Sequence, residues 1–371
     1  MKDIIIVGGG LAGLINAILL SRAGLEVLLI EKKSYPQHRV CGEYISNEVR
    51  PFLENRDLFP AEFQPANITK FQLTSIQGKS AFLPLDLGAF AISRYKLDHF
   101  LYQKALEAGV EFHLNTTIAN IQFQTSSFLL ESRKKKQFEA KIVIGAFGKR
   151  SILDRNMDRT FFHQKSPYVG VKYHIKTDFP DHVVALHNFK DGYCGINKVE
   201  GERYNLCYLS HRNNLRANGS IADMEKAVLQ QNPYLKDIFQ NSDFLFERPE
   251  VINEISFAKK QAVDQHVLMS GDAAGMITPL CGNGMAMAIH SAKILSETIL
   301  EYWNKGKFER QEIEKVYTQK WNQLFATRLW AGRNIQALFG GAWISELAVG
   351  LVKNVKPVAN FLMKQTHGEV F

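Results

Sequence analysis

The sequence predicts an α/β fold built on a parallel sheet, and three observations support this prediction. An apolar strand at residues 4–7 runs into Gly8-Gly9-Gly10 and then into a helix over residues 11–23. A second apolar strand ends at Glu31, about 20 residues beyond the turn. Far along the chain, a third strand ends at Gly271-Asp272 and leads through a glycine-containing loop into a long helix. Strands that alternate with helices in this way are typical of parallel sheets.

The first glycine turn has the spacing of a dinucleotide-binding unit. Gly8 permits a tight turn, Gly10 lets the backbone approach a pyrophosphate, and Gly13 lets the helix and the strand pack closely. The helix directs its first unpaired N–H groups, including those of Leu11 and Ala12, and its positive dipole end at the phosphates. A glycine-rich turn in an ordinary α/β protein is the alternative, and it does not explain the acid at the end of the next strand.

Two acidic residues follow strand ends at the positions that such a site needs. Glu31, next to Lys32, can accept hydrogen bonds from ribose hydroxyls. Asp272, after Gly271, can bind a sugar-like hydroxyl, and the glycines of the following loop allow a flat ring to lie against the backbone. The helix that begins near Met285 would point its positive end at a ring that gains negative charge on reduction.

The composition of the 371-residue chain fits a globular protein with a large core, because 46% of its residues are hydrophobic. Lys and Arg total 45 against 37 Asp and Glu, which gives a formal net charge of +8. A positive charge favours anionic partners: a phosphate-rich cofactor, an acidic carrier protein or an anionic membrane surface. Nucleic acid is not expected as a partner, because the basic residues are scattered and their one run, residues 133–136, fits a hairpin tip.

The chain has four cysteines: Cys41, Cys194, Cys207 and Cys281. They have neither metal-ligand spacing nor the density of a disulfide framework, so we expect no metal and a reducing compartment. Met1 leads directly into the first strand, which leaves no room for a signal peptide. Glycines and Glu346 interrupt the longest apolar stretch, residues 335–352, whereas a membrane span needs about 18 or more apolar residues. We expect a cytoplasmic protein, with peripheral attachment to the inner membrane surface through helices after Trp330 as an alternative.

The pattern of strands and helices predicts a discontinuous cofactor domain with an insertion. Residues 1–65, 90–155 and 256–305 are predicted to form the cofactor domain. Residues 66–89 and 156–255 are rich in alternating β formers and are predicted to form a mainly antiparallel, substrate-binding sheet. Residues 306–371 are predicted to form a helical C-terminal cap. In more detail, we expect a hairpin over residues 128–140, a separate strand at 141–145, a helix over 221–231 and strand from there to residue 255.

Taken together, the motifs resemble a known superfamily. The glycine turn with Glu31, the Gly271-Asp272 box with its tail Pro279-Leu-Cys-Gly-Asn-Gly284, and Arg94-Tyr-Lys-Leu-Asp98 are similar to motifs of FAD-dependent oxidoreductases. The superfamily is that of the aromatic hydroxylases (group A flavoprotein monooxygenases) and the geranylgeranyl reductases. The resemblance implies a Rossmann-like FAD-binding domain of the p-hydroxybenzoate hydroxylase type, an inserted antiparallel sheet and a helical C-terminal region.

The resemblance also implies which residues bind FAD. The first motif would hold the ADP half, the Gly-Asp motif would contact the ribityl chain and the pyrophosphate, and the following loop would lie beside the isoalloxazine. The implied FAD-binding residues are Gly8, Gly10, Leu11, Ala12, Gly13, Glu31, Lys32, Arg39, Arg94, Gly271, Asp272, Pro279, Gly282, Asn283, Gly284 and Met285. The segment Arg39-Val-Cys41-Gly42-Glu43 resembles the reductase branch, whose loop passes the flavin. A surface salt bridge for Arg94 and a surface loop for Arg39 and Cys41 are the alternatives.

Three segments depart from the family patterns. Hydroxylases carry Gly-Ala-Asp-Gly where this chain has Phe147 in place of the aspartate, which removes a residue linked to FAD and NAD(P)H binding. Reductases carry an aromatic residue, then Trp, then Pro beside the prenyl cavity, and residues 191–198 keep Tyr193 but lack the other two. The Trp-x-Trp motif of flavin halogenases is absent from the sequence.

The sequence therefore indicates an FAD-dependent oxidoreductase that acts on a hydrophobic or aromatic small molecule. A monooxygenase-type reaction is slightly favoured for the superfamily as a whole, and the Cys41 loop favours the alternative, reduction of C=C bonds in a prenyl or polyene lipid. A halogenase and a non-enzymatic flavin-binding module are further alternatives. The electron donor stays open between NAD(P)H, reduced flavin and ferredoxin. Tyr193, Cys281 and Cys41 are the candidate catalytic side chains near the reacting ring.

Overall fold

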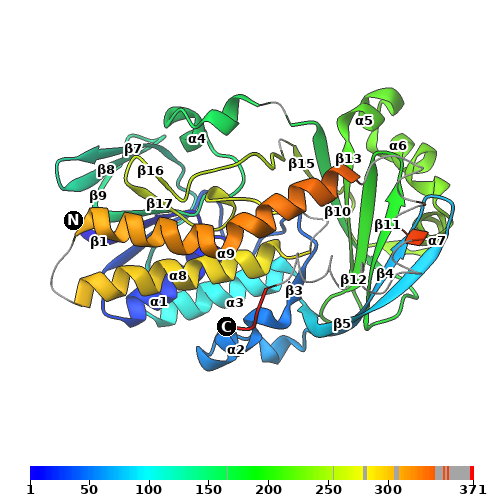
Figure 1. The fold of residues 1–371 in the computed structure, drawn as a ribbon, viewed down its shortest axis with the longest axis horizontal. Helices are drawn as coiled ribbons and strands as arrows, with labels where there is room; N and C mark the ends of the chain where they lie inside the picture. Colours follow the sequence, from blue (N-terminus) through cyan, green and yellow to red (C-terminus); the bar gives the residue numbers. More distant parts are fainter. Residues whose placement is uncertain are drawn as a thin grey trace.

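The computed structural model contains two large sheets that lie side by side with a helical layer beside the first (Figure 1). It describes residues 1–164, 166–253, 255–278, 282–304, 309–338, 346, 349–350 and 368–371. The predicted site residues Pro279 and Cys281, and most of the apolar stretch at 335–352, lie outside the described residues. Among the described helices, none is both long and apolar enough to cross a membrane.

The first sheet is mostly parallel and contains the N-terminal strand at its centre. Its order is β16-β17-β9-β1-β2-β6, and β8 pairs with both β7 and β9. The strands of this sheet are β1 (Lys2–Val7), β2 (Val27–Ile30), β6 (Glu111–His113), β7 (Ile118–Gln124), β8 (Ser127–Ser132), β9 (Gln137–Gly145), β16 (Val263–Asp264) and β17 (Val267–Met269). The carboxyl ends of the parallel neighbours β1, β2, β9 and β17 therefore lie at one edge of the sheet, where ligands of open α/β sheets bind.

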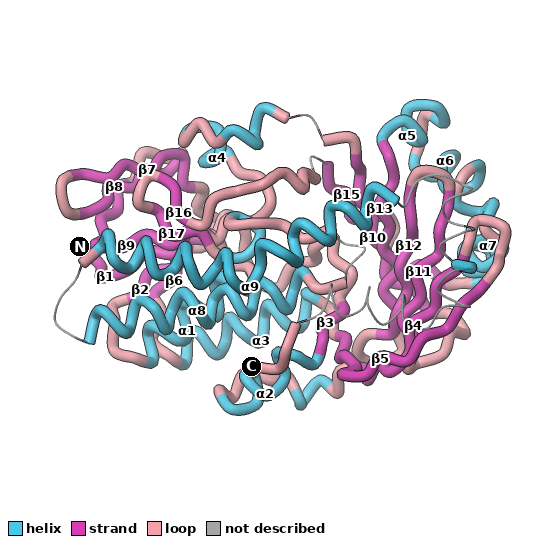
Figure 2. Tube along the Cα trace, viewed as in Figure 1, coloured by secondary structure: helices cyan, strands magenta, loops and turns pink. Residues whose placement is uncertain are grey.

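Four helices cover one face of this sheet (Figures 1 and 2). They are α1 (Leu11–Arg22), α3 (Arg94–Glu107), α8 (Gly284–Asn304) and α9 (Arg310–Leu338). Helix α1 packs against both α3 and α8, and α8 packs against α9. The apolar faces of these helices share one core with β1 and β2, so the first and the last described thirds of the chain fold as one unit.

The second sheet is mostly antiparallel, in the order β14-β10-β13-β12-β11-β4-β5-β3, and β15 pairs with β10. Its strands are β3 (Tyr44–Ser46), β4 (Ala66–Thr74), β5 (Ser80–Ala91), β10 (Tyr168–Lys176), β11 (Val183–Phe189), β12 (Gly192–Lys198), β13 (Tyr204–His211), β14 (Asp243–Phe244) and β15 (Glu250–Asn253). Alternate residues of β10, β12 and β13 pack on a core under α6 (Ile221–Ala227) and α7 (Pro233–Asn241). The other residues face the first sheet.

The remaining helices are short: α2 (Arg50–Asn55), α4 (Ile152–Asn156) and α5 (Arg212–Asn218). Helix α5 was not predicted, and the prediction of strand over residues 233–241 was wrong, because α7 forms there. Asn232 caps α7 by accepting a hydrogen bond from the Tyr234 N–H at 2.9 Å, and Pro233 occupies the first helical turn. The separate strand at 141–145 was also wrong, because β9 is continuous: its first half pairs with β8 and its second half with β1.

Candidate active site

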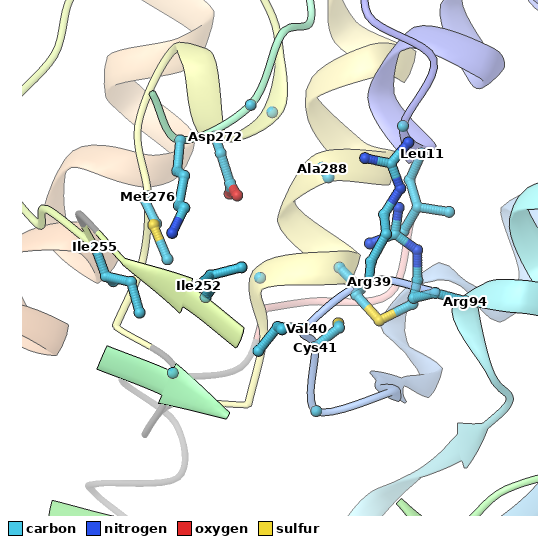
Figure 3. A pocket seen from close by; sticks show the side chains of 18 of the residues that line it. Leu11, Arg39, Val40, Cys41, Arg94, Ile252, Ile255, Asp272, Met276 and Ala288 are labelled. Carbon is cyan, nitrogen blue, oxygen red and sulfur yellow. The ribbon is translucent and has the colours of Figure 1, made fainter. Parts of the chain in front are cut away.

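A cavity of about 620 Å³ lies between the two sheets and receives residues from both. This volume is within the range of roughly 300–1,000 Å³ that is typical of small-molecule sites. Figure 3 shows Arg39 and Arg94 at one side, Asp272 and Met276 at another, and Ile252 of the second sheet. The glycine turn after β1, the Gly-Asp segment after β17 and the loop that contains Cys41 all line this one space.

The glycine turn after β1 has the conformation that its sequence predicts. Gly8 has a φ of +107°, and a Cβ atom there would clash with the carbonyl oxygen of Ala146. A Cβ atom at Gly13 would clash with the carbonyl oxygen of Gly8, so helix α1 can pack this closely on the turn only with glycine. At Gly10 a Cβ atom would meet one neighbour, Arg94 Nη2 at 3.8 Å. The backbone at Gly10 is therefore open toward the cavity.

Glu31 is buried at the end of β2 and lines the cavity beside the glycine turn. Its Oε2 accepts a hydrogen bond from the Gly9 N–H at 2.6 Å, and its Oε1 accepts one from the Lys33 N–H at 3.1 Å. The guanidinium of Arg39 lies 3.8 Å from Glu31 Oε2. The carboxylate is thus fixed in place by the backbone, with lone pairs left for a ligand.

Two arginines share one buried carboxylate at the start of α3. Arg94 donates from Nε and Nη2 to Asp98 at 2.6 and 2.8 Å, and Arg39 donates from Nε to the same carboxylate at 3.0 Å. Asp98 is fully buried, whereas both arginines line the cavity. Burial opposes the charge of Arg94, but attraction and hydrogen bonding to Asp98 outweigh it and raise its pKa. The pair therefore presents fixed positive charge to the cavity, which rules out the surface salt bridge for Arg94.

Hydrogen bonds from two buried cationic side chains hold the backbone of the Gly271-Asp272 segment. The Lys260 ammonium donates to the carbonyl oxygens of Asp272 and Lys149, both at 2.7 Å. Arg159 donates to the carbonyl oxygen of Ala273 at 3.0 Å. Burial lowers the pKa of Lys260 to about 8, and it raises the pKa of Asp272. The contacts that Lys260 and Arg159 make to this segment go to its backbone carbonyls, and the side chain of Asp272 is directed at the cavity (Figure 3).

A chain of buried hydroxyl and amide groups joins the two cofactor motifs directly. Asn16 of α1 donates to Ser270 Oγ at 3.1 Å and accepts from Ser296 Oγ at 2.9 Å. Ser291 Oγ accepts from the Gly271 N–H at 2.8 Å and lies 3.0 Å from Ser270 Oγ. A buried polar group that lost its hydrogen-bond partner would destabilise the folded protein, so such a network favours one geometry over others. The first helix and the Gly-Asp segment are therefore held in one arrangement.

The loop over residues 31–43, which precedes β3, contains Arg39 and runs on to the second sheet. Its Glu43 is fully buried, and its carboxylate contacts Lys172 and His174, which project from β10. The carbonyl oxygen of Gly42 accepts a hydrogen bond from Asn205 at 2.9 Å. The loop is thus attached to the second sheet on the side that faces the cavity, and Cys41 lines the cavity between these attachments and the arginines.

The wall that the second sheet contributes is mainly apolar. Its apolar members, together with Met276 of the loop after β17, are Phe71, Leu85, Val184, Leu186, Leu209, Ile252 and Ile255. Tyr193 and Asn197 of β12 flank Gly195, which has Leu186 and Cys207 as its cross-strand partners. A Cβ atom at Gly195 would make only ordinary contacts, at 3.6 and 3.9 Å. Glycine is therefore not required by the backbone here, and its absent side chain enlarges the cavity.

The structure brings most of the predicted site residues together. The predicted residues that line the cavity are Gly8, Gly10, Leu11, Ala12, Glu31, Lys32, Arg39, Cys41, Arg94, Tyr193, Gly271, Asp272, Gly282, Gly284 and Met285. Gly13 does not line it, because it packs on the turn. Asn283 does not line it either: it is fully buried, and its amide donates to Glu48 at 3.3 Å.

Sequence reasoning assigned no role to the residues that support the site from behind, although it named His174 as a histidine that could line a cavity and included Asp98 in the Arg94 motif. These residues are Glu48, Asp98, Lys172, His174, Asn205 and Lys260. A signal existed for two of them: in the strand 169–175 every second residue is apolar, whereas Gly170, Lys172 and His174 share the opposite face. Two polar residues on the inner face of a buried strand indicate a partner of opposite charge. The sequence did not show that Glu43, more than a hundred residues away, would be that partner.

Comparison with known proteins agrees with this geometry. Residues 1–313 match the model of a family described as FAD binding domain. The chain belongs to this family. It is therefore an FAD-dependent oxidoreductase, as the resemblance implies.

Relatives cover nearly the whole chain at low identity. A digeranylgeranylglycerophospholipid reductase of Methanosarcina acetivorans is 24% identical over 336 residues, which are 86% of this chain and 80% of the relative. A geranylgeranyl bacteriochlorophyll reductase-like protein of Thermoplasma acidophilum superposes with a TM-score of 0.78 at 18% identity, over 98% of this chain and 96% of the other. PqsL of Pseudomonas aeruginosa, described as a probable FAD-dependent monooxygenase, superposes with a TM-score of 0.76 at 16% identity, over 94% and 99%. These structural likenesses show the fold.

The residues around the cavity fit FAD. The open backbone at Gly10 and the unpaired N–H groups at the start of α1 can receive a pyrophosphate, and the charges of Arg39 and Arg94 lie beside them. Glu31 can accept hydrogen bonds from a ribose, as the sequence predicts. The glycines Gly282 and Gly284 leave room for a flat ring at the start of α8. Phe147, where hydroxylases carry aspartate, lines the same cavity.

Proposed function

We propose that this enzyme reduces carbon–carbon double bonds in an extended apolar substrate of the prenyl or polyene type. The observation that carries this proposal is the composition of the cavity wall on the second sheet. Phe71, Leu186, Leu209, Ile252 and Ile255 offer dispersion contacts and no hydrogen bonds, which suits a hydrocarbon chain. Relatives at 24% identity are named digeranylgeranylglycerophospholipid reductase and geranylgeranyl diphosphate reductase, and these names support the same substrate class.

The residues that would hold FAD are those around the glycine turn, the arginines and the Gly-Asp segment. Bound FAD in its reduced form would supply a hydride to a double bond or would activate molecular oxygen. The protein must orient the substrate against the ring and keep water out. The apolar wall does both, because it excludes water and fixes a chain by shape. The electron donor, NAD(P)H, reduced flavin or ferredoxin, stays a prediction of the sequence analysis.

Reduction of a double bond also needs a proton at the second carbon, and Cys41 is our candidate for its donor. Its thiol lines the cavity, on a loop anchored to the second sheet and to α3. Cys207 also lines the cavity, but burial raises its pKa to about 12, so it holds its proton too tightly to serve. Tyr193, predicted as catalytic, is 5% exposed on the apolar wall, and we assign it to substrate contact.

Hydroxylation of a hydrophobic or aromatic substrate is the second candidate. Asn197 places an amide on the cavity wall two residues from Gly195, where it could bind a polar substituent of an aromatic ring. The likeness in fold to PqsL is compatible with this reaction.

Anaerobic turnover distinguishes the two reactions. The FAD-loaded enzyme is reduced with dithionite without oxygen and mixed with geranylgeranyl diphosphate or a geranylgeranyl glycerolipid. We expect products that are heavier by two hydrogens per reduced bond, detected by mass spectrometry. If these substrates stay unchanged without oxygen and a hydroxylated product forms when air is admitted, the reductase proposal is wrong and hydroxylation takes its place.

A further inference from the structure

We infer that Glu43, with Lys172 and His174, is a positioning residue that fixes the thiol of Cys41 at the cavity. These three residues are called the Glu43 cluster below. The inference rests on the proposed role of Cys41, but it concerns the position of the thiol, which can be measured without any substrate.

The Glu43 cluster is a closed set of buried ionisable groups. Glu43 Oε1 accepts from the Lys172 ammonium and from the backbone N–H of Arg94, the latter at 2.7 Å. Glu43 Oε2 lies 2.7 Å from His174 Nε2. The side chains of Glu43, Lys172 and His174 are 0%, 0% and 2% exposed. Burial alone would raise the pKa of Glu43, but Lys172 and His174 outweigh it and lower the pKa, so the carboxylate is charged.

The cluster and Asn205 together hold the loop on both sides of Cys41. Before Cys41, the Lys172 ammonium donates to the carbonyl oxygen of Arg39 at 3.2 Å. After Cys41, Asn205 donates to the carbonyl oxygen of Gly42 at 2.9 Å, and Glu43 follows directly. His174 and Asn205 are cross-strand partners on β10 and β13. Two neighbouring strands of the substrate sheet therefore hold the three residues Val40-Cys41-Gly42 from one side.

The same carboxylate fixes the neighbour of the thiol. Glu43 accepts from the Arg94 N–H at the first position of α3, and the guanidinium of Arg94 is in turn held by Asp98. The Cys41 side chain also lies within hydrogen-bonding reach of the Arg94 side chain. Glu43 thus sets the position of Cys41 relative to the cationic group beside it.

Stability alone does not account for this arrangement. Well-packed apolar residues are often as stabilising as a buried ion pair, or more so, because both charges lose their hydration. Glu43 also has a φ of +53°, a left-handed conformation that is unfavourable for a residue with a side chain. A strained, charged residue at this point is explained by the position that it imposes on the loop.

The test measures the rate at which iodoacetamide alkylates Cys41 in the full-length, FAD-loaded protein, followed by peptide mass spectrometry. Glu43→Gln keeps the size of the side chain and removes its charge. We expect Cys41 to react at least threefold faster in this variant than in the wild type, because the released loop exposes the thiol. Cys41→Ser identifies the peptide.

Glu225→Gln is the matched control. Glu225 is another buried carboxylate against the same two strands, and it accepts hydrogen bonds from Tyr173 at 3.0 Å and Tyr208 at 2.7 Å. It belongs to α6, which packs on the face of the sheet that points away from the cavity. A general loosening of the sheet would affect Cys41 equally in both variants, whereas a positioning role affects it in Glu43→Gln alone.

The double variant Glu43→Gln, Lys172→Met removes both partners of the buried Glu43–Lys172 ion pair and serves if the single variant does not fold. The threefold faster alkylation is expected here too. A Cys41 rate below threefold over the wild type, or one that Glu225→Gln matches, overturns the inference. Because the readout needs no substrate, a protein that passes this test and still fails to reduce a double bond refutes the proposed function and leaves the positioning role standing.

Discussion

Glu31 and Gly9, 22 residues apart, are joined by a 2.6 Å hydrogen bond from the backbone N–H of Gly9 to the Glu31 carboxylate. The acid that the sequence analysis assigns to the ribose thus also stabilises the turn that receives the pyrophosphate. The two halves of the nucleotide site are coupled, so a change at the acid is expected to affect the phosphate end as well.

Glu31→Gln is expected to weaken FAD binding about 10- to 100-fold, since hydrogen bonds to charged groups contribute about 1.5–3 kcal/mol. Titration of the apoprotein with FAD, followed by quenching of flavin fluorescence, measures the dissociation constant. Glu26→Gln, at an exposed acid of the same strand–helix–strand unit, should leave it unchanged. Equal affinity in wild type and Glu31→Gln would show that the ribose contact does not form.

Asp98→Asn is expected to destabilise the protein by about 3–5 kcal/mol, because it leaves Arg39 and Arg94 without their shared buried carboxylate. Denaturant unfolding measures the change. The control is Glu54→Gln, which removes an ion pair with Arg50 in which both side chains are more than 40% exposed, and it should cost less than about 1 kcal/mol. A similar loss of unfolding free energy in both variants would mean that water compensates Arg39 and Arg94 for the missing carboxylate.

Gly195→Leu is expected to reduce the turnover of long prenyl substrates at least tenfold while FAD affinity stays within twofold of the wild type. The new side chain would enter the cavity between Tyr193 and Asn197, on the substrate wall. Gly195→Ala should reduce turnover less than Gly195→Leu, because the methyl group of alanine fills less of the cavity. Measuring turnover across prenyl chains of increasing length tests this, and a loss that is independent of chain length would contradict it.

Lys260 is expected to give the stability a specific pH dependence. Burial lowers its pKa from 10.5 to about 8. Between these values the unfolded chain binds more protons than the folded chain, so stability rises with pH across this window. Relative to Lys260→Met, the wild type should gain at most about 3 kcal/mol from pH 8 to 10.5. Urea unfolding at several pH values measures this difference, and parallel curves for the two proteins would contradict the lowered pKa.

The sequence was sufficient for the parts of the fold that depend on local rules. The Gly8 turn, the helix after it and the N-cap at Ser93, whose side chain accepts from the Lys96 N–H at 3.2 Å, follow from spacing and residue type. Helix α7 was missed although Asn232 and Pro233 carry a start signal, because the helix is short and lies among strand-like residues. The apparent break within β9 reflects a change of partner, which a single sequence does not show.

For the site, the sequence supplied the residues that face the ligand, and it did not supply those that hold them. Gly10, Glu31 and Asp272 belong to motifs that are read locally. Asp98 and Glu43 owe their roles to partners 59 and 131 residues away, Arg39 and His174. Such pairings depend on the tertiary arrangement of two sheets, and a single sequence carries no direct signal for them.

The hydrogen bond between Asn16 and Ser270 spans 254 residues of sequence. During synthesis the N-terminal turn therefore leaves the ribosome long before its counterpart exists, and it must wait for most of the chain to be translated. We therefore expect flavin capture to be a late event in the biogenesis of this protein. Chains that stop before β17 would lack one half of the site and would remain colourless.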